Sequence, residues 1–408
     1  MAGTSRAERS KPLDERRRSV TLQETSRFDC EQEKYLLSAQ RDKIIMENKP
    51  RLFGVLLKAA LLFVLFNFGF ILISGVPLGK LTLYNSIFPG RERFPFGETR
   101  ESYNLSLFDL DAMFASHIIN GAQKAPEEYR VLLIGDSSIW GTLLTPQQTL
   151  AGQLNAHPIT ACGKNIHAYN LGYPTISLTK DLMILDQAKA YQPDLIIWLT
   201  TLEAFPKGKQ LSSPIVANNA RRVQSLITNY NLSLNPNDSA LVHASKWDQT
   251  FVSQRRAIAD LVRLQIYGAL WASTGIDQVY PANYEHAQIE LEANRDFHGL
   301  TSLQHSLALD VLDAGMTVAP HMMLVNEPIL ISNGANSDIR YNFFYPRWAF
   351  DDYRAMLSER AAANHWNYLD LWDLIPVNEF TNSAIHLTPS GEKLFTDKIA
   401  AAIQTSCK

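Results

Sequence analysis

One serine and one histidine stand where a parallel sheet would bring them together. Ser137 follows the apolar run 129–134 through Gly135 and Asp136, and His386 lies just before a helical stretch at the C-terminus. Sites in open parallel sheets form at the carboxyl ends of the strands, so both residues are expected at one edge. A hydroxyl at the start of a helix, beside an imidazole that can take its proton, can attack an acyl carbon. The pair therefore indicates nucleophilic catalysis.

The elements that would position this pair are strands alternating with helices. Short apolar runs predict strands at 129–134, 166–171, 195–199, 322–325 and 368–371. Intervening stretches predict helices at 147–155, 178–191, 300–313, 350–364 and 391–404. This alternation is typical of an α/β protein with a parallel sheet covered on both faces. Between about 205 and 299 no strand pattern occurs, and helical spacing near 218–229 and 245–272 predicts a helical insertion or lid.

A long apolar segment precedes this region. From 52 to 79 the sequence has one charged residue, Lys58, and between Ala59 and Val76 only Asn67 and Ser74 are polar. About 20 apolar residues suffice for a helix to cross a bilayer, so the segment predicts one transmembrane helix with the lipid bilayer as its partner. The alternative is a buried core helix, although core helices are seldom apolar on every face. Roughly fifty polar residues come first, which argues against a cleaved signal peptide.

The charges beside the apolar segment predict its orientation. Five Lys or Arg residues lie within 32–51, and three follow within the twenty residues after Gly79. This bias favours a cytoplasmic N-terminus and an extracytoplasmic C-terminal domain in the cell membrane. The expected organisation is a partly disordered cytoplasmic tail (1–51), the membrane helix (52–79), a connector (80–128) and an α/β domain (129–408). Within the tail, 28–48 has the spacing of a juxtamembrane helix, and a solvated linker is the alternative.

Composition and cysteine usage exclude several classes. The 408 residues include 38 basic and 41 acidic side chains, a net charge of −3, which gives no reason to expect nucleic-acid binding. Cys30, Cys162 and Cys407 are the cysteines, and no CxxC or Cys/His cluster suggests a metal site; no cofactor is expected. With the predicted topology, Cys162 and Cys407 share the external side, where a disulfide between them is possible.

The order of these motifs resembles the SGNH/GDSL hydrolase superfamily. Gly135-Asp136-Ser137-Ser138 looks like its first block, Asn170-Leu171-Gly172 like its glycine block, and the segment from His386 to Gly391 (HLTPSG) like its histidine block. The resemblance implies a three-layer, flavodoxin-like sheet. It implies Ser137 as nucleophile, His386 as base, and an oxyanion hole formed by the N–H groups of Ser137 and Gly172. Asp136, within the first block, is counted with the oxyanion and substrate residues.

The sequence departs from the family pattern at two places. The third block normally supplies an asparagine that donates to the oxyanion, but Thr200 and Thr201 follow the third apolar run here. A threonine hydroxyl, that of Thr200 or Thr201, could substitute. The family also has an aspartate shortly before the histidine, where this chain has Asn382 and Ser383. Asn382 can hold a histidine tautomer but brings no negative charge to an imidazolium.

Other roles for these residues stay open. Asp136 and Ser137 could form a helix N-cap, and His386 could be a structural histidine. Glu203 could bind or orient a substrate, and Asn326-Glu327 lies at the same predicted sheet edge.

The resemblance favours a membrane-anchored serine esterase or O-acyltransferase. Its substrate would be an ester of an envelope or extracellular polymer, such as a polysaccharide or cell-wall component. Two blocks are degraded, so the alternative is a catalytically inactive domain that serves as a binding or assembly module in the envelope.

Overall fold

The computed structural model describes most of the chain, namely residues 34–41, 43, 52–73, 78–97, 107–274, 286, 291–292, 297 and 299–407. By their contacts the residues form two units, Met1–Gly69 and Phe70–Lys408, and each is described by itself. Most of the predicted cytoplasmic tail lies outside the described residues. Within it, residues 34–41 are helical, which agrees with part of the predicted juxtamembrane helix.

The apolar segment forms helix α2 (Leu52–Ile73), 22 residues long. It is long and apolar enough to cross a membrane, and large apolar side chains such as Leu61 and Phe63 are exposed along it. Little of this helix is buried, which argues against the buried core helix that was the alternative prediction.

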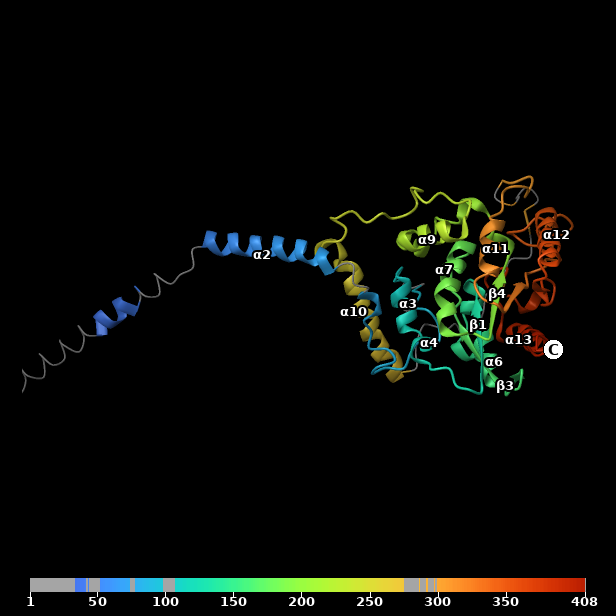
Figure 1. Ribbon diagram of the computed structural model, residues 1–408, viewed down its shortest axis with the longest axis horizontal. Helices are drawn as coiled ribbons and strands as arrows, with labels where there is room; N and C mark the ends of the chain where they lie inside the picture. Colours follow the sequence, from blue (N-terminus) through green and yellow to red (C-terminus); the bar gives the residue numbers. More distant parts are fainter. Residues whose placement is uncertain are drawn as a thin grey trace, which may run out of the picture. The chain divides into compact units, whose positions relative to one another are not determined.

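A six-stranded sheet forms the centre of the second unit (Figure 1). Its strands, in the order β2-β3-β1-β4-β5-β6, are β2 (Thr160–Ala161), β3 (Lys164–Asn170), β1 (Glu128–Ile134), β4 (Leu195–Thr200), β5 (Met322–Asn326) and β6 (Asn367–Asp370). All five predicted strands are present, and they pair in parallel. The short strand β2, absent from the prediction, pairs antiparallel with β3. Two residues carry too little pattern for a strand to be recognised in the sequence.

The second unit also contains eleven described α-helices. They are α3 (Leu110–Ser116), α4 (Ile118–Gly121), α5 (Ser137–Trp140), α6 (Leu150–Ala156), α7 (Leu178–Ala188), α8 (Pro214–Asn218), α9 (Ala220–Tyr230), α10 (Phe251–Thr274), α11 (Leu309–Met316), α12 (Arg347–Ala363) and α13 (Pro389–Thr405). Helices α8, α9 and α10 lie in the predicted helical insertion between β4 and β5.

Alternate side chains of the central strands enter two separate cores. Leu132 and Trp198 belong to a core shared with α7, α11 and α12, and Val131 and Ile197 belong to one shared with α6 and α13. Successive side chains of a strand point to opposite faces, so the sheet is covered on both faces. This agrees with the near-continuous apolar character of the predicted strands.

Two predictions need correction. The helix predicted at 300–313 begins only at Leu309, because Leu307 forms a bridge with Pro206 and the N–H of Ala308 donates to the carbonyl of Phe205. A backbone engaged in that pairing cannot also form a helical turn. The segment 80–128 is more than a connector: it contains α3 and α4, and Phe94 is fully buried in the core.

A disulfide joins Cys162, in the turn between β2 and β3, to Cys407, after α13. The bond confirms the pairing that the sequence left as a possibility. It closes 245 residues and fixes the last helix to the edge of the sheet.

Candidate active site

The nucleophile candidate lies on a sharp turn between β1 and α5. Asp136 is the N-cap of α5, with its carboxylate accepting a hydrogen bond from the N–H of Ser138 at 2.9 Å. Ser137 is therefore the first helical residue, where the N–H has no carbonyl partner within the helix. A Cβ at Gly135 would lie 2.6 Å from the side chain of Ile139, so the turn requires glycine there.

Three side chains form a hydrogen-bonded chain at this turn. The Oγ of Ser137 lies 2.8 Å from Nε2 of His386, and Nδ1 of His386 lies 2.9 Å from Oδ1 of Asn382. An amide oxygen at Nδ1 requires the proton on that nitrogen, which leaves Nε2 free to accept the serine proton. The structure thus brings together the three residues that the sequence predicts as nucleophile, base and orienting group.

The loop before α13 holds His386 through its backbone. The carbonyl of His386 accepts from the N–H of Thr381 at 2.8 Å, and Phe380 and Leu387 form a bridge beside it. Thr388 then caps α13 by accepting from the N–H of Gly391 at 3.1 Å. Most of these contacts are local, and the carbonyl of Ala384 also accepts from the N–H of Leu330 at 2.7 Å.

The environment keeps His386 neutral. Its ring retains some exposed surface, yet protein surrounds it on most sides, and this burial lowers the pKa of His386 to about 4. Asn382 supplies no charge that would oppose the shift. A neutral imidazole near pH 7 is the form that can accept a proton from Ser137.

A buried lysine lies under the nucleophile turn. Lys180 of α7 is fully buried, and its Nζ donates to the carbonyl of Gly135 at 2.6 Å. The same Nζ lies 2.5 Å from Oδ1 of Asp181, whose other oxygen accepts from the indole of Trp198 at 3.1 Å. The carbonyl of Gly135 also accepts from the N–H of Tyr173 at 3.0 Å. The backbone just before the nucleophile is thus fixed from two directions.

Glu327 completes this buried cluster. Its carboxyl accepts from Oγ of Ser138 at 2.5 Å, and its backbone N–H donates to the carbonyl of Thr200. Burial raises the pKa of Glu327 well above its usual value, and the nearby carboxylates of Asp136 and Asp181 raise it further. Burial also raises the pKa values of Asp136 and Asp181. The cluster thus places three buried carboxyl groups near a single buried lysine, and burial disfavours the charged form of Glu327.

Arg93 supports α5 from the other end. It belongs to the segment predicted as a connector and is only 1% exposed. Its guanidinium donates to the carbonyls of Gly141 and Leu144 at 3.1 and 2.9 Å and lies 4.4 Å from the ring of Trp140. Neither Arg93 nor Lys180 is among the site residues predicted from the sequence. For Lys180 a signal exists, since the Lys180-Asp181 pair interrupts an otherwise apolar helical stretch.

The two predicted oxyanion donors, the N–H groups of Ser137 and Gly172, differ in whether another group already accepts from them. Gly172 packs against α5 so closely that a Cβ would lie 2.5 Å from the backbone nitrogen of Trp140. Its N–H, however, donates to Oδ1 of Asn170 at 3.1 Å, so it is engaged within the protein rather than free for a ligand. This hydrogen bond forms because Asn170 and Gly172 are only two residues apart. The N–H of Ser137 keeps its predicted availability.

Most of the remaining predicted residues have partners within the protein. Asp136 acts as the N-cap, which was its alternative role. Thr200 is buried at the end of β4, and the hydroxyl of Thr201 lies 3.0 Å from that of Tyr345. The carboxylate of Glu203 pairs with Lys209. A role for Thr200 or Glu203 toward an oxyanion or substrate stays a prediction.

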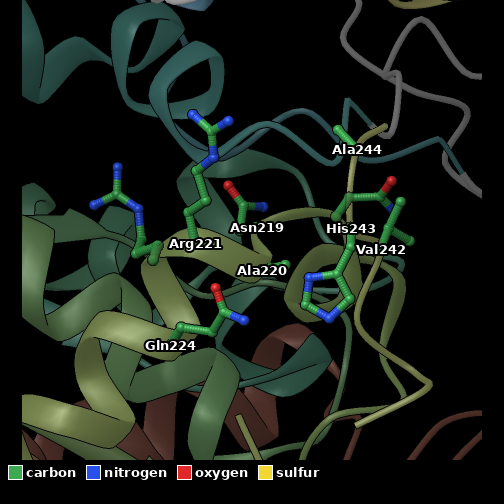
Figure 2. A pocket seen from close by; sticks show the side chains of 9 residues that line it. Asn219, Ala220, Arg221, Gln224, Val242, His243 and Ala244 are labelled. Carbon is green, nitrogen blue, oxygen red and sulfur yellow. The ribbon is translucent and has the colours of Figure 1, made fainter. Parts of the chain in front are cut away.

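A metal site or a cavity away from Ser137, His386 and Asn382 could also bind a ligand. Among the described residues, no group of His, Cys, Asp or Glu side chains could hold a metal ion. A cavity of about 420 Å³ lies where α9 begins, and Figure 2 shows Arg221, Gln224 and His243 around it. Neither Ser137 nor His386 lines that cavity.

Comparisons with known proteins give fold-level likenesses. No family model and no curated protein matches the chain. Among solved structures, it is similar to a carbohydrate acetylesterase family member from Sinorhizobium meliloti (12% identity, covering 68% of this chain and 98% of that one, TM-score 0.31). It is also similar to the native aryl esterase of M. smegmatis (12%, 68% and 98%, 0.32) and to a member of the lipolytic protein G-D-S-L family from Veillonella parvula (9%, 67% and 96%, 0.29). Likenesses at this level assign neither a family nor an activity to the chain.

Proposed function

We propose that this chain is a membrane-anchored serine esterase or O-acyltransferase of the SGNH type. The observation that carries the proposal is the hydrogen-bonded chain Ser137–His386–Asn382 at the carboxyl edge of a parallel sheet. Residues 249 positions apart lie there at the hydrogen-bond spacing that nucleophilic catalysis requires.

The reaction follows from this geometry. Ser137 Oγ attacks the ester carbonyl carbon, and its proton passes to Nε2 of His386 while the carbonyl oxygen becomes an oxyanion. Collapse of the tetrahedral intermediate breaks the ester C–O bond, and His386 returns the proton to the leaving alcohol. Water, or a hydroxyl group of an acceptor, then attacks the acyl-Ser137 and loses its proton to His386. The acyl group leaves, and the proton returns to Ser137 Oγ.

The oxyanion needs donors at the start of α5. The N–H of Ser137 is one, and the helix start favours negative charge. The N–H of Gly172 becomes a second donor when it exchanges Asn170 Oδ1 for the oxyanion. The hydroxyl of Thr200 is the candidate for the third donor.

For the second unit we propose a three-layer, flavodoxin-like fold. The order of the five parallel strands and the cores on both faces of the sheet support it.

The proposed location is the cell membrane, with the N-terminus in the cytoplasm and the catalytic domain outside. The apolar helix α2, the bias of Lys and Arg residues, and the Cys162–Cys407 disulfide support this topology, because disulfides persist in oxidising compartments. In that location the ester would belong to an envelope or extracellular polymer such as a polysaccharide or cell-wall component.

The second candidate is an inactive domain that binds such a polymer or assembles with other envelope proteins. The engagement of Gly172 N–H by Asn170 and the lack of an asparagine after β4 favour it.

Hydrolysis of p-nitrophenyl acetate by the full chain in detergent distinguishes the two. The proposal predicts turnover by the wild type and its loss in Ser137→Ala. Ser138→Ala is the matched control: its hydroxyl contacts Glu327 rather than His386, so activity is expected to persist. Equal rates for wild type and Ser137→Ala would support the inactive domain.

A further inference from the structure

Helix α10 exposes an apolar stripe. Val262, Ile266 and Leu270 are 53%, 57% and 43% exposed. Residues four apart lie on one face of a helix, so the three side chains form a continuous row. The opposite face is packed, since Leu264 and Gly268 are buried. The stripe therefore lies on the side of α10 that faces away from the protein.

The segment before α3 extends this stripe. The hydroxyl of Thr82 and the N–H of Leu83 both donate to Oε1 of Gln265, at 3.2 and 2.8 Å. The hydroxyl of Tyr84 donates to the carbonyl of Leu264. The Tyr84 ring also packs against Gly268, where an added Cβ would lie 2.4 Å from it. These contacts hold residues 81–87 beside α10, as Figure 1 also shows.

This segment brings its own exposed apolar residues. Leu81 and Ile87 are each 70% exposed, and Leu83 is 41% exposed. Because this segment contacts α10 at Gln265 and Leu264, its exposed residues are grouped with the stripe. We call this group the α10 patch, and its members are Leu81, Leu83, Ile87, Val262, Ile266 and Leu270.

Basic residues accompany the patch. Lys80, Arg255, Arg256 and Arg263 are exposed, and Arg263 forms an ion pair with Asp260 at 2.9 Å. A helix with an apolar stripe flanked by arginines is typical of helices that lie in the membrane interface, where guanidinium groups bind lipid phosphates.

We propose that the α10 patch lies on the lipid surface of the bilayer that α2 crosses. The inference depends on the membrane anchoring proposed above. Leu78 follows Ile73 by five residues, which span at most about 18 Å when fully extended. The start of the patch, at Leu81, is therefore tethered within a short distance of the end of the membrane helix. The apolar members would enter the interface, and the basic residues would contact phosphate groups.

Such contact would give the domain a second attachment beside the helix. A domain on a single tether rotates about its linker, whereas two attachments limit that rotation. The patch would thereby fix which face of the domain points toward the membrane.

The test uses the full chain with Cys30→Ser, which leaves Cys162 and Cys407 in their disulfide. An environment-sensitive fluorophore is placed at Ile266→Cys, and the protein is reconstituted in vesicles of phosphatidylcholine with a minor share of phosphatidylglycerol. Lipids that carry a quencher in the acyl chain should quench it and shift its emission to the blue. The matched control is Leu394→Cys on α13, an exposed apolar site (46%) outside the patch, which should be neither quenched nor shifted.

Three outcomes overturn the inference. Equal quenching at Ile266→Cys and Leu394→Cys would mean that lipid contact is unspecific. A blue shift at Ile266→Cys without quenching would mean that a protein, such as a second copy of the chain, covers the patch. Neither signal would mean that the patch faces water.

Membrane anchoring is measured separately, by the lipid quenching of a fluorophore at Leu61→Cys in α2. Quenching there without quenching at Ile266→Cys would reject the patch while leaving the anchor intact. Its absence would reject the anchor and the inference with it. As a second variant, Val262→Glu should abolish quenching of a fluorophore at Leu83→Cys, whereas Leu394→Glu should leave it unchanged.

Discussion

The two sides of the candidate site are held in different ways. The turn that carries Ser137 is fixed by buried groups from distant parts of the chain, including Lys180 and Arg93. The loop that carries His386 is held by neighbours such as Thr381, and Asn382 is exposed to solvent. Buried charged side chains thus hold the nucleophile turn, whereas backbone hydrogen bonds, most of them local, hold the loop of the base.

Because of this difference, substitutions on the two sides should affect stability and activity differently. A change under the nucleophile turn removes a partner from buried charges and should destabilise the fold. A change of the side chain of His386 or Asn382 leaves the backbone hydrogen bonds of the loop in place, so it should alter the reaction while leaving the fold intact. The predictions below test that division.

The largest expected effect is catalytic and comes from the local side. His386→Ala should lower the rate of p-nitrophenyl acetate hydrolysis by about 10²–10⁴-fold, because the general base is lost. The melting temperature should stay near that of the wild type, as measured by circular dichroism. A large drop in melting temperature would contradict the comparison.

The next effect is structural and comes from the non-local side. Lys180→Met should destabilise the protein by about 3–5 kcal/mol, because Asp181 loses its buried partner. Denaturant unfolding measures it. Lys189→Met is the matched control just after α7: its pair with Asp186 is at the surface, so about 0–1 kcal/mol is expected. Equal effects of the two variants would show that the buried cluster does not hold the turn.

The disulfide joins Cys407 after α13, the helix that follows His386, to the turn between β2 and β3. Cys162→Ser combined with Cys407→Ser should lower the free energy of unfolding by about 2–4 kcal/mol. The rate of ester hydrolysis at 25 °C should change little, since neither residue is near His386 in the sequence and the loop keeps its own contacts. A loss of activity in a protein that remains folded would mean that the histidine loop depends on a distant restraint.

The smallest effect is a shift of pH dependence. The pKa of His386 is lowered to about 4, so the wild-type rate should be constant near neutral pH and fall only as the pH drops through about 4. Asn382→Asp places a carboxylate at Nδ1, which stabilises the imidazolium and raises that midpoint by about one unit, or roughly 1.4 kcal/mol. The pH–rate profile measures both. An unchanged midpoint would remove Asn382 from the orienting role.

The same pKa affects stability. Because the folded protein holds His386 neutral while the unfolded chain protonates it near its ordinary pKa of 6.5, this group favours unfolding increasingly as the pH falls from about 6.5 to 4. Above that range it has no effect. In His386→Ala this part of the acid sensitivity should disappear.

Much of the fold and the three central site residues could be predicted from the sequence. Strands buried on both faces leave continuous apolar runs, and the carboxyl ends of such strands are where ligands bind. Reading the residues after those runs located Ser137, and the residues before the last helix located His386 and Asn382. The roles of these residues remain predictions.

The rest could not be predicted because it depends on tertiary contacts. Lys180 looks like a surface lysine until its helix packs against the sheet and its Nζ reaches Gly135. Arg93 lies in a stretch with no periodic pattern, yet it is buried against α5. That the N–H of Gly172 donates to Asn170 depends on a side-chain orientation that no pattern encodes.

The central claim is that Ser137 is a nucleophile activated by His386. It is tested most directly by treating the folded full chain with a fluorophosphonate and locating the adduct by fragmentation mass spectrometry, which separates Ser137 from Ser138. We predict one adduct, on Ser137, that forms quickly in the wild type and far more slowly in His386→Ala. A folded wild type that forms no adduct, or forms it on another residue, would contradict the claim.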